Sequence, residues 1–342
     1  MYMKKYFLLS LMALTLVACS NEEQEFPDFD YSTVYFAYQY PVRTLTLGET
    51  LYNNELDNAH KVKLMATWGG RYTNKKDVVI DVEVDSVLCR NLYFKNNNAK
   101  VQVMPASYYE LADSKIKIPA GSIIGGVEIK LTDAFFNDPL ALSRNYVIPV
   151  VMKKVSGADY ILTGEAVPTV DSPNRNQADH WITLPKDYVL YAVRYINTWD
   201  GSYLRRGKDE ITSGGVTTTS VRHRPAVEND ELCKLSTVSL SKIDFPVKYY
   251  DANGNVVNQA SLELIFDANG NCTIGSRTAG VTATGTGSFK KKSELKSWGN
   301  KDRDALYLDY AIDFGARRYA TRDTLVARDR GIIMETFEVV VK

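Results

Sequence analysis

The chain has 342 residues, with 41 basic and 41 acidic side chains, so its formal net charge is zero. This balance gives no overall positive field for a polyanion, and we expect no nucleic-acid partner. An apolar content of 45% is typical of a globular protein and excludes a disordered chain, and the length suffices for two domains.

The first residues have the pattern of a secretory signal peptide. Lys4 and Lys5 precede an apolar run that ends at Leu16 and is too short to span a bilayer comfortably. The tetrapeptide Leu16-Val17-Ala18-Cys19 resembles the lipobox of bacterial lipoproteins. This resemblance implies a signal peptide at 1–18, lipidation of Cys19 and attachment to the outer membrane through the lipid. The alternative is an ordinary signal peptide that contains a cysteine.

Residues 19–30 are acidic and lack an apolar period, so they predict a flexible tether. Ser20, Glu22 and Glu23 resemble the surface-export signal of Bacteroidetes-type lipoproteins, which implies display on the cell exterior. A solvated spacer is the simpler interpretation, and the two are compatible.

Short strands at regular spacing dominate residues 31–162 and predict an Ig-like β-sandwich without a helix of three turns. The row Asp81, Glu83 and Asp85 alternates with apolar residues, which indicates a solvated sheet face more than a metal site. The predicted strands are Val34–Tyr40 (ended by Pro41), His60–Thr67, Asp77–Leu88, Lys115–Ile118, Gly126–Leu131 and Tyr146–Lys153.

Pro, Asn, Ser and Gly collect at residues 163–180, where we place a linker, and residues 181–342 are again β-rich. This second domain includes a long apolar run at 188–196. The pentapeptide Asp-Ala-Asn-Gly-Asn occurs at 251–255 and 267–271 and predicts two hairpins with type I′ turns, rather than calcium loops. Successive hairpins suggest a barrel, for instance a calycin-like one, or a second sandwich.

Cysteine and histidine are too few and too scattered for a zinc or catalytic motif. We expect no metal and no cofactor. Cys89, Cys233 and Cys272 are predicted to be buried free thiols, although a Cys233–Cys272 bridge is the alternative.

One stretch combines aromatic rings, cations and a carboxylate within a few residues, as a sugar-binding face requires. Trp199 could equally close the end of a barrel, with an arginine stacked over it. The candidate ligand-binding residues are Trp199, Asp200, Tyr203, Arg205 and Arg206, with Trp181 and Trp298 as secondary candidates.

Short motifs in both halves carry a family resemblance. In the first half they are Val34-Tyr35-Phe36 with Pro41 and Arg43, Ile116–Gly121, Leu131-Thr132-Asp133 and Tyr146–Val150, and in the second half Asn197–Gly207, Leu308-Asp309-Tyr310, Asp323–Val326 and Arg328-Asp329-Arg330. On these motifs, residues about 30–162 resemble a Bacteroidetes domain of unknown function found in glycan-utilisation-locus lipoproteins and at the N-terminus of family-18 endoglycosidases. Residues about 175–342 resemble its usual C-terminal partner. The resemblance implies surface display beside glycan importers and brings no active site.

The sequence therefore favours a non-catalytic, cell-surface lipoprotein that binds an oligo- or polysaccharide, with importer-complex proteins as further partners. A structural or adhesin-like protein that binds another protein is the alternative. A glycosidase is less favoured, because no pair of carboxylates stands out and the family-18 motif is absent from the sequence.

Overall fold

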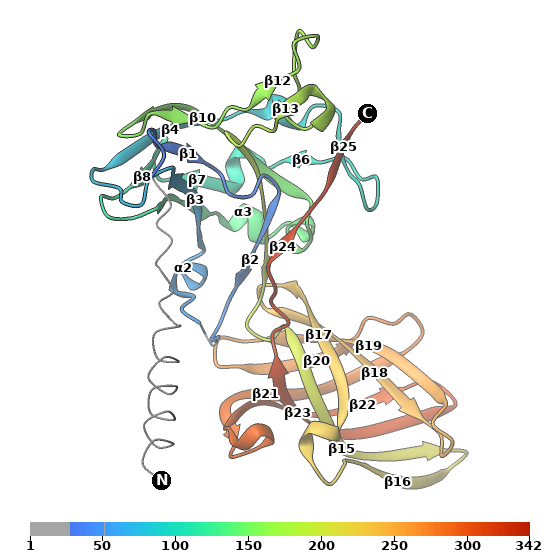
Figure 1. Cartoon of the computed structure of the whole chain (residues 1–342). Helices are drawn as coiled ribbons and strands as arrows, with labels where there is room; N and C mark the ends of the chain where they lie inside the picture. Colours follow the sequence, from blue (N-terminus) through green and yellow to red (C-terminus); the bar gives the residue numbers. More distant parts are fainter. Residues whose placement is uncertain (1–27, 51) are drawn as a thin grey trace, which may run out of the picture.

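The computed structural model describes residues 28–50 and 52–342. The predicted signal peptide, Cys19 and the predicted export signal lie outside these residues. Two β domains are stacked end to end, and the C-terminal strand returns from the second domain to the first (Figure 1). In the part of the chain described, no helix is long and apolar enough to span a membrane.

The described residues of the first domain form a twelve-stranded, sandwich-like sheet around a shared core. Helices α2 (Glu55–Asn58) and α3 (Asp133–Phe136) have four residues each. Along the sheet the order is β11 (Tyr160–Ile161), β1 (Thr33–Tyr35), β3 (Lys61–Gly69), β9 (Ile124–Leu131), β8 (Lys115–Ile118), β4 (Val78–Val84), β10 (Tyr146–Ser156), β14 (Tyr188–Ile196), β2 (Pro41–Thr46) and β24 (Glu335–Thr336), with β6 (Gln102–Val103) on β10 and β7 (Tyr109–Leu111) on β9. Two separate two-stranded sheets complete the first domain. They are β12 (Glu165–Ala166) with β13 (Trp181–Thr183), and β5 (Leu92–Phe94) with β25 (Val339–Val341).

Alternation places the predicted acidic row on the outside of the sheet. Val78, Ile80 and Val82 of β4 are buried in the core, while Asp81 and Glu83 face solvent. These two carboxylates pair with lysines of neighbouring strands, Lys115 and Lys153. Asp81 and Glu83 therefore form a solvated, salt-bridged sheet face, whereas Asp85 follows the strand and accepts a hydrogen bond from the backbone N–H of Val87.

Strand β2 departs from the sequence-based prediction, because Pro41 begins a strand instead of only ending one. The predicted strand 34–40 is β1 followed by a loop, and β2 then pairs in parallel with β14. Proline lacks an N–H donor but is tolerated at the first residue of a strand.

Strand β14 is buried on both faces, which explains its continuous apolar run. One face packs into the main core through Val189, Tyr191 and Val193. The opposite face joins a second cluster through Leu190 and Ala192, together with residues of β5, β10 and the C-terminal segment.

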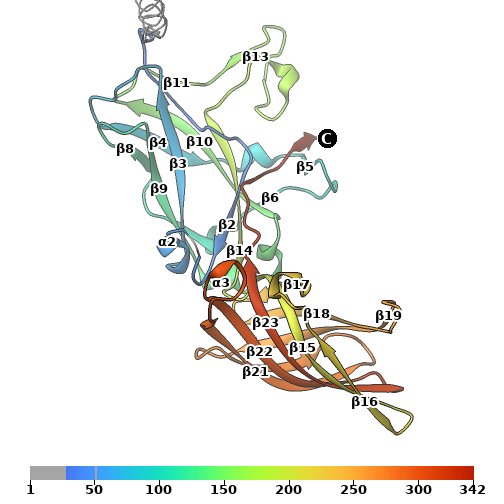
Figure 2. The ribbon, with the colours of Figure 1, turned by 60° about the horizontal axis from the view of Figure 1, so that its bottom comes forward.

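The sheet pairing differs from the predicted boundary, which assigned residues 181–342 to the second domain. Strand β14 lies beside β10 and β2 in the first domain, and β24 and β25 pair with β2 and β5. Parallel pairing of β14 with β2 joins segments 150 residues apart, a pairing that local composition does not encode. The chain consequently crosses between the domains twice, at 197–200 and at 330–334 (Figures 1 and 2).

The second domain is a barrel, one of the two predicted architectures. Eight described strands close it, because β15 pairs with both β17 and β23. The short strand β16 (Val216–Arg222) pairs antiparallel with residues 207–213, the second half of β15. The barrel strands are β15 (Gly201–Ser213), β17 (Glu231–Ser239), β18 (Lys242–Tyr250), β19 (Val256–Phe266), β20 (Asn271–Ser276), β21 (Thr282–Glu294), β22 (Arg303–Asp313) and β23 (Arg317–Asp329).

Both repeated pentapeptides form the predicted hairpin turns, which join β18 to β19 and β19 to β20. The turn type is different from the predicted type I′. Gly254 and Gly270 have positive φ angles, but the asparagines before them do not. Instead, the Asp251 carboxylate accepts hydrogen bonds from the backbone N–H groups of Asn253 and Asn255, and Asp267 does the same in its turn. Aspartate therefore organises these turns, and glycine supplies the one left-handed residue.

The cysteines of the described chain are free and buried, as predicted: Cys89, Cys233 and Cys272. Burial raises the pKa of each thiol to about 12. The proposed Cys233–Cys272 bridge does not form.

Candidate functional site

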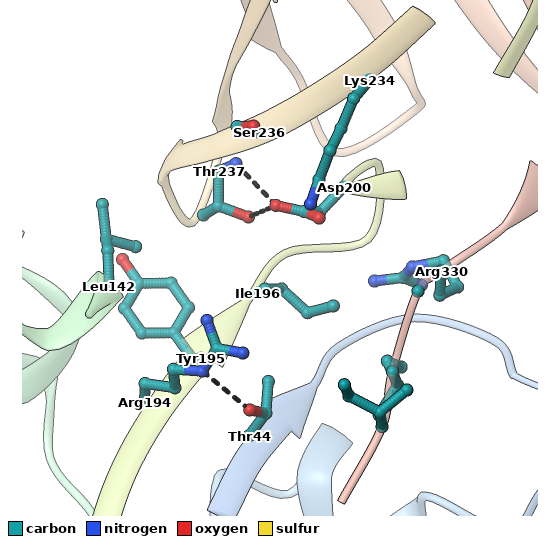
Figure 3. Close-up of a pocket in the computed structure, with 13 residues that line it drawn as sticks. Thr44, Leu142, Arg194, Tyr195, Ile196, Asp200, Lys234, Ser236, Thr237 and Arg330 are labelled. Carbon is teal, nitrogen blue, oxygen red and sulfur yellow. Dashed lines mark hydrogen bonds between the residues drawn. The ribbon is translucent and has the colours of Figure 1, made fainter. Parts of the chain in front are cut away.

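A polar cleft of about 240 Å³ lies where the two domains meet (Figure 3). Strands β2 and β14 of the first domain form one side, and β17 of the barrel forms the other. The returning segment 330–333 runs along its edge. Interfaces between domains are a frequent place for ligand sites, because two surfaces there converge without filling the space.

Asn197 fixes the first crossing between the domains and thereby positions the cleft. This fully buried residue donates from its side chain to the carbonyl oxygens of Ser239 and Lys242, at 2.8 and 3.0 Å. Its backbone N–H donates to the Thr237 hydroxyl at 3.0 Å. The end of β14 is therefore tied to the β17–β18 hairpin, and the angle between the domains follows from this junction.

Asp200 is the sole carboxylate among the described residues that line the cleft. One of its oxygens accepts hydrogen bonds from the backbone N–H and the hydroxyl of Thr237, both at 2.7 Å. Asn197, Thr237 and Asp200 are thus joined by consecutive hydrogen bonds. This carboxylate has a positioning role, and the cleft offers no second acid for a two-carboxylate reaction.

Three cations line the cleft, and they differ in how they are held. Arg194 donates from Nε to the Thr44 hydroxyl at 2.9 Å and pairs through Nη2 with Glu335 at 2.5 Å. No described protein group accepts a hydrogen bond from its Nη1. The exposed side chain of Lys234 has no hydrogen-bond or ion-pair partner among the described residues.

Arg330 links the two segments where the chain crosses between the domains, 330–334 and 197–200. Its Nη groups donate to the carbonyl oxygen of Leu47 at 3.2 Å and to that of Asn197 at 2.5 Å. Its buried Nε has no partner, and no carboxylate of the described residues pairs with the side chain. Burial therefore lowers the pKa of Arg330 below its ordinary value.

Apolar side chains form the remaining walls of the cleft. Leu142 and Ile196 lie on the first-domain side, and Ile332 and Ile333 lie on the returning segment. Ile333 leaves 70% of its surface exposed. The cleft thus combines free hydrogen-bond donors with apolar walls, the pattern that suits a sugar ring with its hydroxyls and its C–H faces.

The predicted candidate Trp199 lies at the end of the barrel, beside the cleft but not among its lining residues. Its ring stacks on Phe266, with 3.9 Å between the ring centroids and 9° between the planes. Trp199 therefore occupies the packing position at the end of the barrel, the alternative to stacking on a ligand. Tyr203 is also buried, and its hydroxyl donates to the Trp199 carbonyl oxygen at 2.9 Å.

Arg205 is buried inside the barrel in a network of charges. Its Nε donates to Asp323 at 2.9 Å, and its guanidinium also contacts Glu231 and the Tyr310 hydroxyl. Arg222 completes the network, since it binds both Asp323 and Asp209. Burial alone would lower the pKa of Arg205, but these partners raise it well above its ordinary value.

The other predicted candidates are spread over the molecule. Arg206 pairs with Asp230 at 2.6 Å on the outside of the barrel. Trp298 lies under the Arg303 guanidinium, 3.6 Å from its ring centroid, and Trp181 belongs to β13 at the far end of the first domain (Figure 1). Of the seven candidates, the structure brings only Asp200 to the cleft.

Sequence reasoning missed the three cations of the cleft. Arg194 lies in the apolar run 188–196, Lys234 lies in an ordinary barrel strand, and Arg330 lies in the stretch Arg328-Asp329-Arg330, which carried the family resemblance. An arginine inside an otherwise apolar strand was the one local signal that could have identified Arg194.

The fold and the cleft define an all-β protein with a sandwich-like domain and a barrel. A family model described as Domain of unknown function (DUF5627) matches residues 198–331, and a model for an N-terminal domain matches residues 29–159. No curated protein sequence matches the chain.

A solved structure of a Bacteroides ovatus protein of unknown function is similar over nearly the whole chain. It is 46% identical, with a TM-score of 0.86, and the match covers 92% of this chain and 100% of that one. The chain belongs to the same Bacteroides family. The resemblance to a Bacteroidetes domain of unknown function is thereby confirmed, whereas the lipid anchor stays a prediction.

Two further solved structures are much less similar. A multidomain protein including DUF1735 from Bacteroides ovatus is 14% identical, with a TM-score of 0.40 and coverage of 88% of this chain and 97% of that one. An auxiliary nutrient binding protein from Bacteroides thetaiotaomicron is 13% identical, with a TM-score of 0.39 and coverage of 83% and 90%. At these scores neither likeness carries an argument about function.

Proposed function

We propose that this protein is a non-catalytic surface lipoprotein that binds glycans in the cleft between its two domains. The observation that carries the proposal is the composition of the cleft: free cationic donors and apolar walls surround a single carboxylate. Glycosidase chemistry needs two carboxyl groups facing each other, whereas binding needs only donors, acceptors and an apolar surface.

The size of the cleft limits the ligand. A volume of about 240 Å³ lies below the roughly 300–1,000 Å³ typical of pockets for drug-sized molecules. The cleft therefore takes the end of a glycan chain, one or two sugar units, while the rest of the glycan extends past the exposed Ile333.

Blocking the cleft tests this proposal directly. Ser236 is exposed on β17 and lines the cleft, and no described residue hydrogen-bonds to its side chain. Ser236→Trp fills the space without removing an interaction. The matched control is Thr219→Trp, an exposed residue of β16 outside the cleft. On a glycan array the control is expected to bind as the unaltered protein does, and Ser236→Trp is expected to lose binding.

Two results would overturn the proposal. If the unaltered protein binds no glycan on the array, the function is different. If it releases reducing ends from a glycan that it binds, the protein is an enzyme.

Surface display is tested separately from binding. Cys19→Ser is expected to move the protein from the membrane fraction to a soluble fraction, and an antibody is expected to label intact cells that make the unaltered protein. A membrane-bound Cys19→Ser variant would contradict the predicted lipid anchor.

A further inference from the structure

The charges around the cleft do not balance, and this imbalance bears on the choice of ligand. Arg194, Lys234 and Arg330 line it, whereas Asp200 is the carboxylate among its described lining residues and Glu335, outside the lining, pairs with Arg194. The group as a whole therefore carries one uncompensated positive charge.

Each of the two carboxylates is already engaged through one of its oxygens. Asp200 accepts two hydrogen bonds from Thr237, and Glu335 is bound by Nη2 of Arg194. The donors that stay free are the ammonium group of Lys234 and Nη1 of Arg194. Figure 3 shows these two side chains on opposite sides of the cleft, one from β17 and the other from β14.

Arg330 adds positive charge without adding a free donor. Its Nη groups are occupied by carbonyl oxygens, and its Nε is buried. Burial lowers the pKa of its guanidinium from the ordinary value, and the charges of Asp200 and Asp304 offset this lowering only in part. A negative group in the cleft would supply the missing compensation through space.

We propose that the cleft selects a glycan whose terminal sugar carries one negative charge, either a carboxylate or a sulfate ester. This inference rests on the proposed glycan-binding function and narrows its ligand class. The free donors of Lys234 and Arg194 would approach the anion from two sides, and the charge of Arg330 would stabilise it through space. Charge-assisted hydrogen bonds of this kind are stronger than those between neutral groups.

Matched glycans test the inference on the purified protein. The array carries each backbone in neutral, carboxylated and sulfated form, including lactose, 3′-sialyllactose and 3′-sulfolactose. Affinities for the best backbone are then measured by calorimetry at low and high salt. We expect the anionic form to bind at least about tenfold more tightly than the neutral form, and we expect salt to weaken it, since screening acts on partly exposed charges.

Lys234 is the residue to change, because it is exposed and its side chain has no partner whose loss would disturb the fold. Lys234→Gln is expected to weaken the anionic ligand about three- to tenfold and Lys234→Glu more, with no effect on a neutral glycan. Lys248→Gln and Lys248→Glu are the controls, since Lys248 is likewise exposed on the neighbouring strand β18 but lies outside the cleft.

The outcomes separate the two proposals. Equal or tighter binding of neutral glycans would overturn the anionic selectivity and leave glycan binding in place. Equal losses in the Lys234 and Lys248 variants would place the anion elsewhere on the barrel and also overturn it. No binding to any glycan would overturn both proposals. Selectivity for only the carboxylated or only the sulfated form would identify the source of the charge.

Discussion

Arg205 is fully buried and Arg330 is partly buried, and the two arginines have different hydrogen-bond partners. Inside the barrel, Arg205 contacts the carboxylates Asp323 and Glu231, and its pKa rises well above the ordinary value. At the domain junction, Arg330 contacts only carbonyl oxygens, and its pKa falls. The charge of Arg205 is paired with carboxylates of the protein. The charge of Arg330 has no paired carboxylate among the described residues, so an anionic ligand could compensate it.

A glycine inside the barrel leaves space for the Asp323 carboxylate to pair with both Arg205 and Arg222. Gly207 of β15 lies against Asp323, and a Cβ atom there would come within 2.3 Å of that carboxylate. The absence of a side chain at Gly207 makes room for the carboxylate between Arg205 and Arg222. Buried charges are tolerated only when they are paired and hydrogen-bonded in this way.

Removing a charge from the interior network should have the largest effect on stability. Arg205→Met keeps much of the side-chain volume but deprives Asp323 of one of its two guanidinium partners. We expect a loss of about 3–5 kcal/mol in the free energy of unfolding, measured by urea denaturation. A loss below about 1 kcal/mol would show that the network does not stabilise the barrel.

The same network should make stability depend on pH. Burial alone would raise the pKa of Asp323, but Arg205, Arg222 and the Tyr310 hydroxyl outweigh it and hold the pKa below its ordinary value of 3.8. Because the folded pKa is depressed, the stabilisation is present above about pH 4 and is lost as the pH falls through the folded pKa. Asp323→Asn is therefore expected to be less stable than the unaltered protein at pH 7.

The difference in unfolding free energy between Asp323→Asn and the unaltered protein should narrow progressively below pH 4. Urea denaturation at a series of pH values measures it, and Asp309→Asn, a change to an exposed carboxylate on the outside of the barrel, serves as the control. A gap that keeps its full size down to the lowest pH at which the protein still folds would contradict the assigned role of Asp323.

Arg330→Met should have a smaller effect than Arg205→Met, because Arg330 donates only to neutral carbonyl oxygens. We expect a loss of about 1–2 kcal/mol in the free energy of unfolding. Loss of the contact to Leu47 and Asn197 should also loosen the two crossings, which limited proteolysis of segments 197–200 and 330–334 would detect. If the two arginine variants lose equal stability, the distinction between the barrel interior and the cleft fails.

Lys234→Gln should have the smallest effect, a change of less than about 0.5 kcal/mol in unfolding free energy, because Lys234 is exposed and has no described partner. Thermal denaturation beside Lys248→Gln checks this. A large loss would mean that Lys234 is part of the folded framework and is not free for a ligand.

Much of the secondary structure could be predicted from local sequence pattern. The predicted strand Lys115–Ile118 has the bounds that the structure shows, the apolar run 188–196 coincides with β14, and the two pentapeptide turns lie at the predicted positions. Alternation of apolar and polar residues is set by the two-residue period of a strand, so it can be read from neighbours in the chain. The Trp199–Arg206 stretch, predicted to bind a ligand, lies on β15 and its approach, and Tyr203 and Arg205 are buried inside the barrel.

The sequence by itself determined that this is an all-β chain with alternating apolar strands and two hairpin turns at the repeated pentapeptide, because those features depend on residues close together in the chain. The type of those turns and the free state of the thiols were settled by the structure. Only the tertiary structure decided that β14 and the C-terminal strands belong to the first domain, and that Arg194, Lys234 and Arg330 meet in one cleft. Those arrangements depend on pairing between distant segments. Composition alone does not distinguish an arginine paired inside a barrel from one left uncompensated at a domain junction.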